Sequence, residues 1–335
     1  MLRFATALGS LLLLGFQAAP PVLPDHLARL MGDAEAARSF DYMRLKSEGS
    51  DLTILNDAAK QLVRIRAGAD ERDLGGRCMT DAELEVRMGL EAGNLVPDAT
   101  AFEADKVAAA NALNAWATFS DGVFAGDQPA EQPLASIASW VRGANNAPTD
   151  RQRELFRRVG QDQALRHAFG AGQMVWGELS PGALSRVHAV LGRRICNIDG
   201  DNTAWLRTDI AANGWYRIST TSAAADNAAW LLSQHADRNP QFQREVLAIL
   251  EPLVALKETS PSSYAYLRDR VAVNEDRPQR YGTQGGCIAT NVWAPDQLED
   301  SERVQALRDD LELGSLAEYT AHMHQYCADF TPPAP

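Results

Sequence analysis

Apolar residues recur along most of the chain at the spacing of amphipathic α-helices. Residues 51–66 place leucine, isoleucine, valine and alanine near a period of 3.6 residues, and residues 101–119 do so again. Asn239-Pro240 and Ser260-Pro261 each put a capping side chain before a proline, which is tolerated in the first helical turn. With the apolar spacing around them, they predict further helices near residues 222–237, 240–256, 261–273 and 315–327.

Two short segments interrupt the helical pattern with residues that favour extended structure. They are Gly214–Ile218 and Cys287–Trp293, and each is short enough to form an extended piece or part of a hairpin. The predicted fold class is therefore mainly α, with at most a small β-hairpin.

A loop over residues 143–148 is the best candidate for a domain boundary. Its Gly-Ala-Asn-Asn-Ala-Pro sequence is typical of a connection, and Thr149 and Gln152 directly after it have the spacing of a capping box. A chain of 335 residues is long enough for about two domains. We therefore predict a helical, hairpin-like domain over 21–145 and a C-terminal domain over 150–328.

The first twenty residues have the organisation of an export signal. Arg3 precedes an uncharged stretch from Phe4 to Phe16, which at about 13 residues is shorter than the roughly 20 that span a bilayer. A buried amphipathic helix is the alternative interpretation. We expect residues 1–20 to be a signal peptide, the protein to be periplasmic or secreted, and no membrane span to remain after its removal.

The charge and the cysteines narrow the classes of function further. Lysine and arginine number 32 against 44 acidic residues, a formal charge of −12, so binding to nucleic acid is not expected. An even number of cysteines in an exported chain favours disulfide bonds, with the pairing left open. Cys78 alone precedes residue 190, so full pairing would join the two halves; otherwise Cys78 is a free, buried thiol.

No motif predicts a bound metal or cofactor. The four cysteines form no C-x-x-C pair and no cysteine–histidine cluster with the spacing of a zinc site. We therefore expect no metal ligands and no cofactor.

The helix after Thr149 carries polar side chains on its apolar face. Asp162 and Arg166 continue the stripe of Leu155 and Val159 at steps of three and four, and Gln163 lies beside them. Because a buried carboxylate is costly unless it is paired, Asp162 and Arg166 indicate an ion pair. The pair is either structural, or it orients another polar group at a functional site.

A histidine occupies an apolar stripe in the helix predicted near 222–237. His235 follows the stripe of Ala228 and Leu231, while Gln234 and Asp237 lie on the neighbouring face. His235 and Asp237 can converge only if the helix ends near Ala236. A hydrogen-bonded core histidine and a functional histidine are both consistent with this pattern.

A glycine-rich loop supplies a third group of polar side chains. Gln279, Arg280, Tyr281 and Gln284 offer donors and acceptors, and the glycines between 282 and 286 allow close backbone approach. The glycine spacing is not that of a phosphate-binding loop. The loop is either a binding element or a well-bonded connector.

Taken together, these stretches resemble a bacterial family known only as a domain of unknown function. The matching elements are Asp162-Gln163 with Arg166, then Gln234-His235-Ala236-Asp237, then the sequence Tyr-Gly-Thr-Gln from Tyr281 to Gln284. The resemblance extends over about 150–325. It implies a largely helical domain with recurring polar residues, and it implies no activity.

Two classes of function remain in competition, and the sequence leaves open whether the protein is an enzyme. In the first, an exported hydrolase uses His235, Asp237 and Asp162 as catalytic groups on a small polar or anionic molecule. Substrate-binding residues would then be Gln163, Arg166, Gln234, Gln279, Arg280, Tyr281 and Gln284.

In the second class of function, the helices over 21–145 bind an envelope protein or peptide, and the polar cluster is structural. Metal carriage is a third, weaker alternative. The first class requires that His235, Asp237, Gln279 and Tyr281 converge on one solvated pocket.

Overall fold

The structure is a computed structural model that describes residues 22–68, 76–126, 135–328 and 330. The predicted signal peptide over 1–20 lies outside the described residues. Among the helices of this part of the chain, none is both long and apolar enough to cross a bilayer.

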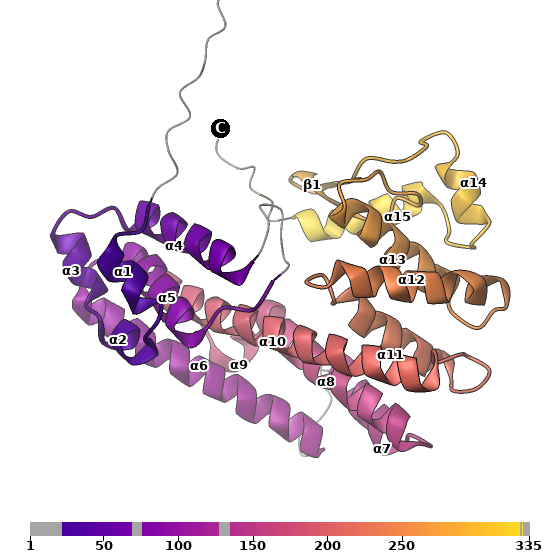
Figure 1. Cartoon of the computed structure of the whole chain (residues 1–335), viewed down its shortest axis with the longest axis horizontal. Coiled ribbons are helices and arrows are strands. Elements are labelled where there is room, and N and C mark those ends of the chain that lie inside the picture. The colour runs from indigo at the N-terminus through magenta and orange to yellow at the C-terminus, as the bar shows by residue number, and fades with distance from the viewer. Residues whose placement is uncertain (1–21, 69–75, 127–134, 329, 331–335) are drawn as a thin grey trace, which may run out of the picture.

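Helices make up almost all of the regular structure, as the spacing of apolar residues predicted (Figure 1). Those before the predicted boundary are α1 Asp25–Leu30, α2 Ala34–Ser39, α3 Tyr42–Ser47, α4 Leu52–Ala67, α5 Asp81–Leu95, α6 Ala99–Ala125 and α7 Ala135–Asn145. Those after it are α8 Asp150–Ala171, α9 Gln173–Trp176, α10 Pro181–Asn213, α11 Ala223–Gln234, α12 Pro240–Ala255, α13 Pro261–Asn274, α14 Val304–Asp309, α15 Leu316–Met323 and the 3₁₀ turn η1 His324–Cys327.

A single antiparallel hairpin is the β structure of the described residues. Its strands are β1 Gly285–Ala289 and β2 Val292–Pro295, in which Cys287 pairs with Trp293. The prediction of a small hairpin is confirmed for Cys287–Trp293, and Gly214–Ile218, expected to be an extended piece or part of a hairpin, forms no strand. That segment is a connection whose aromatic side chains are buried in the core, where the Trp215 indole N–H donates to Asp226 at 2.7 Å.

Three apolar clusters form the interior. One lies among α1 to α6, and another joins α8 and the end of α10 to α11, α12 and α13. The third contains Trp116 and Ile137 from before the predicted boundary and Ala164 and Leu191 from after it. Because this core is shared across residues 143–148, the division into domains over 21–145 and 150–328 stays a prediction.

All four cysteines form disulfide bonds, as their even number favoured. Cys78 is bonded to Cys196, 118 residues away, and Cys287 to Cys327. The first bridge ties the segment before α5 to the middle of α10, so the two halves are covalently joined. The second fastens the hairpin to the C-terminal 3₁₀ turn.

Candidate functional site

Asp162 on α8 is the centre of the polar cluster. Its side chain is fully buried and accepts hydrogen bonds from Arg166 Nε at 3.0 Å and from Gln163 Nε2 at 2.9 Å. Burial opposes its ionisation, but His235, Arg166 and Gln163 together outweigh that effect and keep the pKa of Asp162 below its ordinary value. Asp162 is therefore a buried carboxylate held in its charged form.

His235 lies where α11 ends. The helix stops at Gln234 because the chain must turn before Asn239, whose side chain caps α12 by accepting from the amide of Phe242. This turn directs the His235 ring at α8, with Nδ1 2.9 Å from Asp162 Oδ2. The ring nitrogen is not aligned for a good hydrogen bond, so the contact is a close approach of imidazole to carboxylate.

Asp199 on α10 completes the cluster. Arg166 Nη2 donates to its carboxylate, while the same guanidinium holds Asp162 through Nε. Burial raises the pKa of Asp199 to about 7; the negative charges of Asp162 and Asp237 add to the effect and Arg166 opposes it. A carboxyl group that titrates near neutral pH can both donate and accept a proton there.

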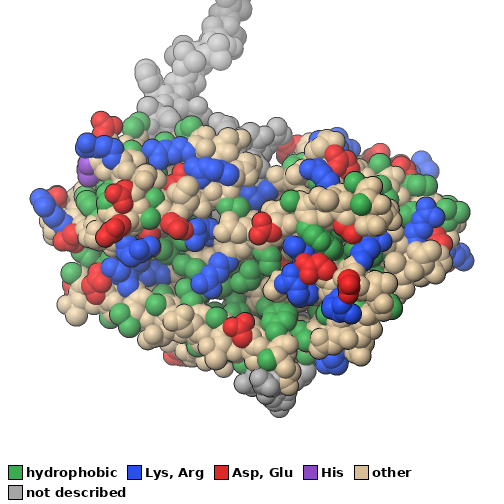
Figure 2. All heavy atoms as spheres, turned by 60° about the horizontal axis from the view of Figure 1, so that its bottom comes forward, with side chains coloured by type: hydrophobic (Ala, Val, Ile, Leu, Met, Phe, Trp, Pro, Cys, Tyr) green, Lys and Arg blue, Asp and Glu red, His purple; other side chains and the backbone are tan. Residues whose placement is uncertain are grey.

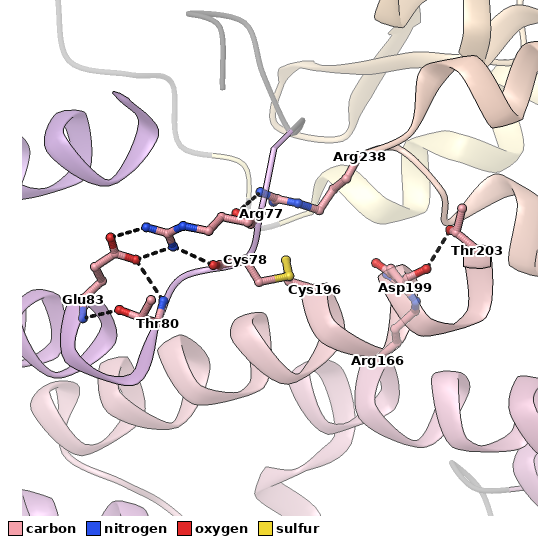
Figure 3. The surroundings of a disulfide bond; sticks show 9 residues. All are labelled: Arg77, Cys78, Thr80, Glu83, Arg166, Cys196, Asp199, Thr203 and Arg238. Atoms are coloured by element: carbon pink, nitrogen blue, oxygen red, sulfur yellow. Dashed lines mark hydrogen bonds and ion pairs between the residues drawn. A yellow bond between two sulfur atoms is a disulfide. The ribbon is translucent and has the colours of Figure 1, made fainter. Parts of the chain in front are cut away.

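These groups lie beside a cavity of about 300 Å³. Its lining includes Gly76, Arg77, Cys78, Cys196, Asp199, Thr203, Arg207, His235, Arg238 and Asn239. Figure 3 shows Asp199 and Arg166 on the same side of α10 as the Cys78–Cys196 bridge. The cavity is thus bounded by α10, by the turn after α11 and by the segment before α5.

Asp162, Asp199 and His235 also have the spacing of a metal-binding set. One ligand atom from each lies within 4.8 Å of the others. However, the Arg166 guanidinium already contacts both carboxylates, and its positive charge opposes a cation at the same place. The arrangement is better suited to holding and moving protons.

Asp237 is near this cluster but has its own partner. Arg270 on α13 donates to both of its oxygens at 2.7 and 2.6 Å, and Gln243 Nε2 donates at 3.0 Å. Burial opposes its ionisation, and the bonds from Arg270 and Gln243 outweigh it, so the pKa of Asp237 is lowered. Asp237 therefore fixes the turn after α11 against α12 and α13, and its charge acts on Asp199 from a distance. Gln234 is buried within the same turn.

The expected convergence of the glycine-rich loop on this cavity is not found. The loop closes instead around Asp269 of α13, whose carboxylate accepts from the amides of Arg280, Tyr281 and Thr283 and from the Thr283 hydroxyl. Asp269 is fully buried. Backbone donors that sequence patterns do not reveal thus hold the loop away from His235.

Each predicted residue of this loop has a local role. Gln279 is buried and exchanges hydrogen bonds with the backbone of Gln284, whose side chain turns to Thr283. Tyr281 is buried against Tyr264. None of these residues, nor Arg280, lines the cavity beside His235. Gly282 has a φ of +67°, a conformation that favours glycine, and a Cβ there would lie 2.8 Å from Leu316.

Asp199 is the residue that sequence reasoning missed. It continues the stripe of Val187, Leu191 and Ile195 at steps of four, and Asn202 follows three residues later. The same periodicity that identified Asp162 could have found it. Its surroundings in sequence, Asn-Ile-Asp-Gly-Asp-Asn, are so polar that no single carboxylate stands out.

A larger cavity of about 790 Å³ lies between α6, α7, α8 and α10. Trp116, Phe124 and Leu165 give it an apolar surface, and Arg153 and Arg194 are among the charged residues around it. Figure 2 looks on to this side of the molecule and shows a hollow with hydrophobic side chains between charged ones of both signs. None of the predicted site residues lines it, so we place the chemistry at the smaller cavity.

The residues of this acid–imidazole cluster lie within a segment of the chain that matches a known protein family. Residues 149–328 match the Family of unknown function (DUF6624). The chain belongs to this family, which agrees with the predicted resemblance to a domain of unknown function over about 150–325. It matches none of the curated proteins and none of the solved structures at a significant level.

Proposed function

We propose that the protein is a hydrolase that uses Asp199 and His235 for acid–base chemistry on a small polar or anionic substrate. The observation that supports this most directly is that Asp199 and His235 line the same cavity and that each has its own charged partner. Asp162 is 2.9 Å from the His235 ring, and Arg166 holds Asp199. Pairs of titratable groups in different environments are typical of acid–base catalysts.

In the proposed reaction His235 is the general base. Asp162 lies 2.9 Å from Nδ1, so Nε2 is the ring nitrogen assigned to proton transfer. Nε2 would take a proton from water as the oxygen of that water attacks the substrate. Asp162 would stabilise the positive charge that then develops on the ring.

Asp199 in its protonated form is the general acid. With its pKa raised to about 7, roughly half of the molecules carry this proton at neutral pH. Asp199 would protonate the leaving group while the Arg166 guanidinium keeps the carboxyl in place. Arg238, which lines the cavity and donates to the Arg77 carbonyl oxygen, would add positive charge for an anionic substrate, whereas Arg207 is already paired with Glu245.

The test is a comparison of Asp199→Asn and His235→Gln with Asp201→Asn. Asp201 lies two residues from Asp199 on α10, is exposed, and lines the larger cavity instead. Hydrolysis of p-nitrophenyl phosphate and p-nitrophenyl acetate, followed by a broader metabolite panel, should be lost in the first two variants and kept in the third. Equal activity in all three would refute the proposal.

We also propose that the protein is exported. Two disulfide bonds are compatible with an oxidising compartment. Mass spectrometry of the protein from the native host would show whether residues 1–20 have been removed.

A second candidate function is ligand binding at the larger cavity, as in a helical adaptor of the cell envelope. The observation that favours it is the apolar surface of Trp116, Phe124 and Leu165. The anionic naphthalene dye 1-anilinonaphthalene-8-sulfonate should bind there with increased fluorescence, and Leu165→Asp should remove the signal. Unchanged fluorescence in that variant would exclude this cavity.

A further inference from the structure

One wall of the cavity beside Asp199 comes from outside the residues that match the family. Gly76, Arg77 and Cys78 line it, whereas the family match begins at residue 149. We call residues 76–80 the strap. Figure 3 shows the strap meeting α10 at Cys196, about one helical turn before Asp199.

The strap is fastened at several points. Cys78 is bonded covalently to Cys196, and Arg238 Nη2 donates to the Arg77 carbonyl oxygen at 3.1 Å. On the other side Glu83, which is buried, accepts from the Arg77 guanidinium at 2.7 and 2.6 Å and from the Thr80 amide at 2.9 Å. These contacts hold the strap as a fixed wall.

The strap bounds one side of a cavity that is partly open to solvent. The Arg77 guanidinium points to Glu83 and away from Asp199, so its charge is directed out of the cavity (Figure 3). The strap therefore presents backbone and disulfide sulfur to the interior. A volume of about 300 Å³ is at the small end of ligand cavities and has no room for a polymer.

We propose that the strap is the specificity-determining wall of this cavity, which admits small polar molecules and excludes bulky ones while the Cys78–Cys196 bridge is closed. The role of the strap in catalysis rests on the proposed hydrolase function. Its role in bounding the cavity does not depend on that function. Breaking the bridge removes the covalent contact nearest Asp199 and leaves the weaker Arg238 contact on that side.

Chemical labelling of His235 tests the enclosure without any substrate. The side chain of His235 is 16% exposed, so diethyl pyrocarbonate should modify its ring slowly in the intact protein. In Cys78→Ala/Cys196→Ala the rate should rise at least about fivefold, because local opening becomes easier. In the matched control Cys287→Ala/Cys327→Ala, which lacks the other bridge, it should stay within about twofold. His188 on α10, which lies at a different pocket, serves as the internal reference.

An equal acceleration in both double variants would overturn the proposal, and so would a parallel acceleration at His188, since either would mean a general loss of stability. If Cys78→Ala/Cys196→Ala does not fold, folded Cys287→Ala/Cys327→Ala is treated with tris(2-carboxyethyl)phosphine, which can then reduce only the bridge of the strap. Unchanged labelling after verified reduction would overturn the proposal as well.

Substrate size supplies the link to catalysis. The ratio of kcat/KM for thymidine 5′-(p-nitrophenyl phosphate) to that for p-nitrophenyl phosphate should rise about tenfold on loss of the bridge, an effect equivalent to about 1.4 kcal/mol. An unchanged ratio in an active enzyme would refute the role in specificity. If Asp199→Asn leaves hydrolysis intact, the hydrolase function fails, while the labelling result still decides the enclosure.

Discussion

Two aspartates within the segment that matches the family have different surroundings. Asp269 is enclosed by backbone amides and a hydroxyl from the loop over 280–283, and it lines neither of the two cavities described above. Asp199 has one charged partner, Arg166, and lies at a cavity wall. Burial raises the pKa of both carboxyl groups. The difference shows that complete enclosure produces a structural carboxylate, whereas incomplete enclosure leaves a group that can exchange protons.

Removal of Asp269 should have the largest effect on stability. Asp269→Ala leaves three buried amides and a hydroxyl without their acceptor, at roughly 1–3 kcal/mol each. We expect the free energy of unfolding to fall by about 4 kcal/mol or more, measured by urea denaturation. Asp269→Asn should lose less. A loss below 1 kcal/mol in the alanine variant would mean that the loop is held by other contacts.

Removal of the ionisable group at Asp199 should affect activity far more than stability. Asp199→Asn keeps an oxygen for Arg166 but has no acidic proton, so kcat should fall about 100-fold or more. The urea midpoint should change little at pH 5, where the native carboxyl is mostly protonated. In the wild type kcat/KM should decline above pH 7 as Asp199 loses its proton. Persistence of that decline in the variant would assign it to another group.

The pH dependence of stability tests whether the pKa of Asp199 is higher in the native state than in the unfolded state. Its native pKa of about 7 lies above the ordinary 3.8, so the native state binds more protons than the unfolded state between these values. The contribution of Asp199 to the free energy of unfolding is fully present below pH 4 and is lost as the pH rises through 7. The loss amounts to roughly 1.4 kcal/mol for each unit by which folding raises the pKa. The wild type should therefore lose stability relative to Asp199→Asn over pH 4–7. Parallel curves would contradict the raised pKa.

The smallest effect is expected at Gln284, within the loop that surrounds Asp269. Its side chain donates to the Thr283 hydroxyl at 3.2 Å and is only partly buried. Gln284→Ala should cost about 0.5 kcal/mol or less and leave activity unchanged. A loss of activity with normal stability would restore this residue to the substrate-binding role that the sequence motif predicted.

Much of the fold follows from the sequence by simple periodicity. Proline and capping residues placed the starts of α12 and α13 correctly, and the position of Cys78 implied a bridge between the halves. Apolar spacing also found the Asp162–Arg166 pair on α8. Helix caps and apolar spacing depend on residues within one or two helical turns, and the bridge between the halves depends on the number and positions of the cysteines. All of these can be read directly from the sequence.

The sequence could not separate the structural polar groups from the reactive ones. Asp269 is satisfied by main-chain amides, which every residue except proline carries, so nothing in the sequence marks its partners. Trp215 lies in a segment predicted to be an extended piece or part of a hairpin, and its hydrogen bond to Asp226, 11 residues away, has no mark in the sequence. Asp199 acquires its altered pKa from burial and from charges on α8 and in the turn after α11, none of which is adjacent in sequence.

The spacing of three residues between Cys196 and Asp199 on α10 has a consequence for how this chain can change. Each residue in a helix advances the side chain by about 100°, so a one-residue insertion between them would swing the carboxyl group out of reach of Arg166. This interval of one turn has a fixed length, because it sets the direction of the Asp199 carboxyl group relative to the disulfide-bonded Cys196.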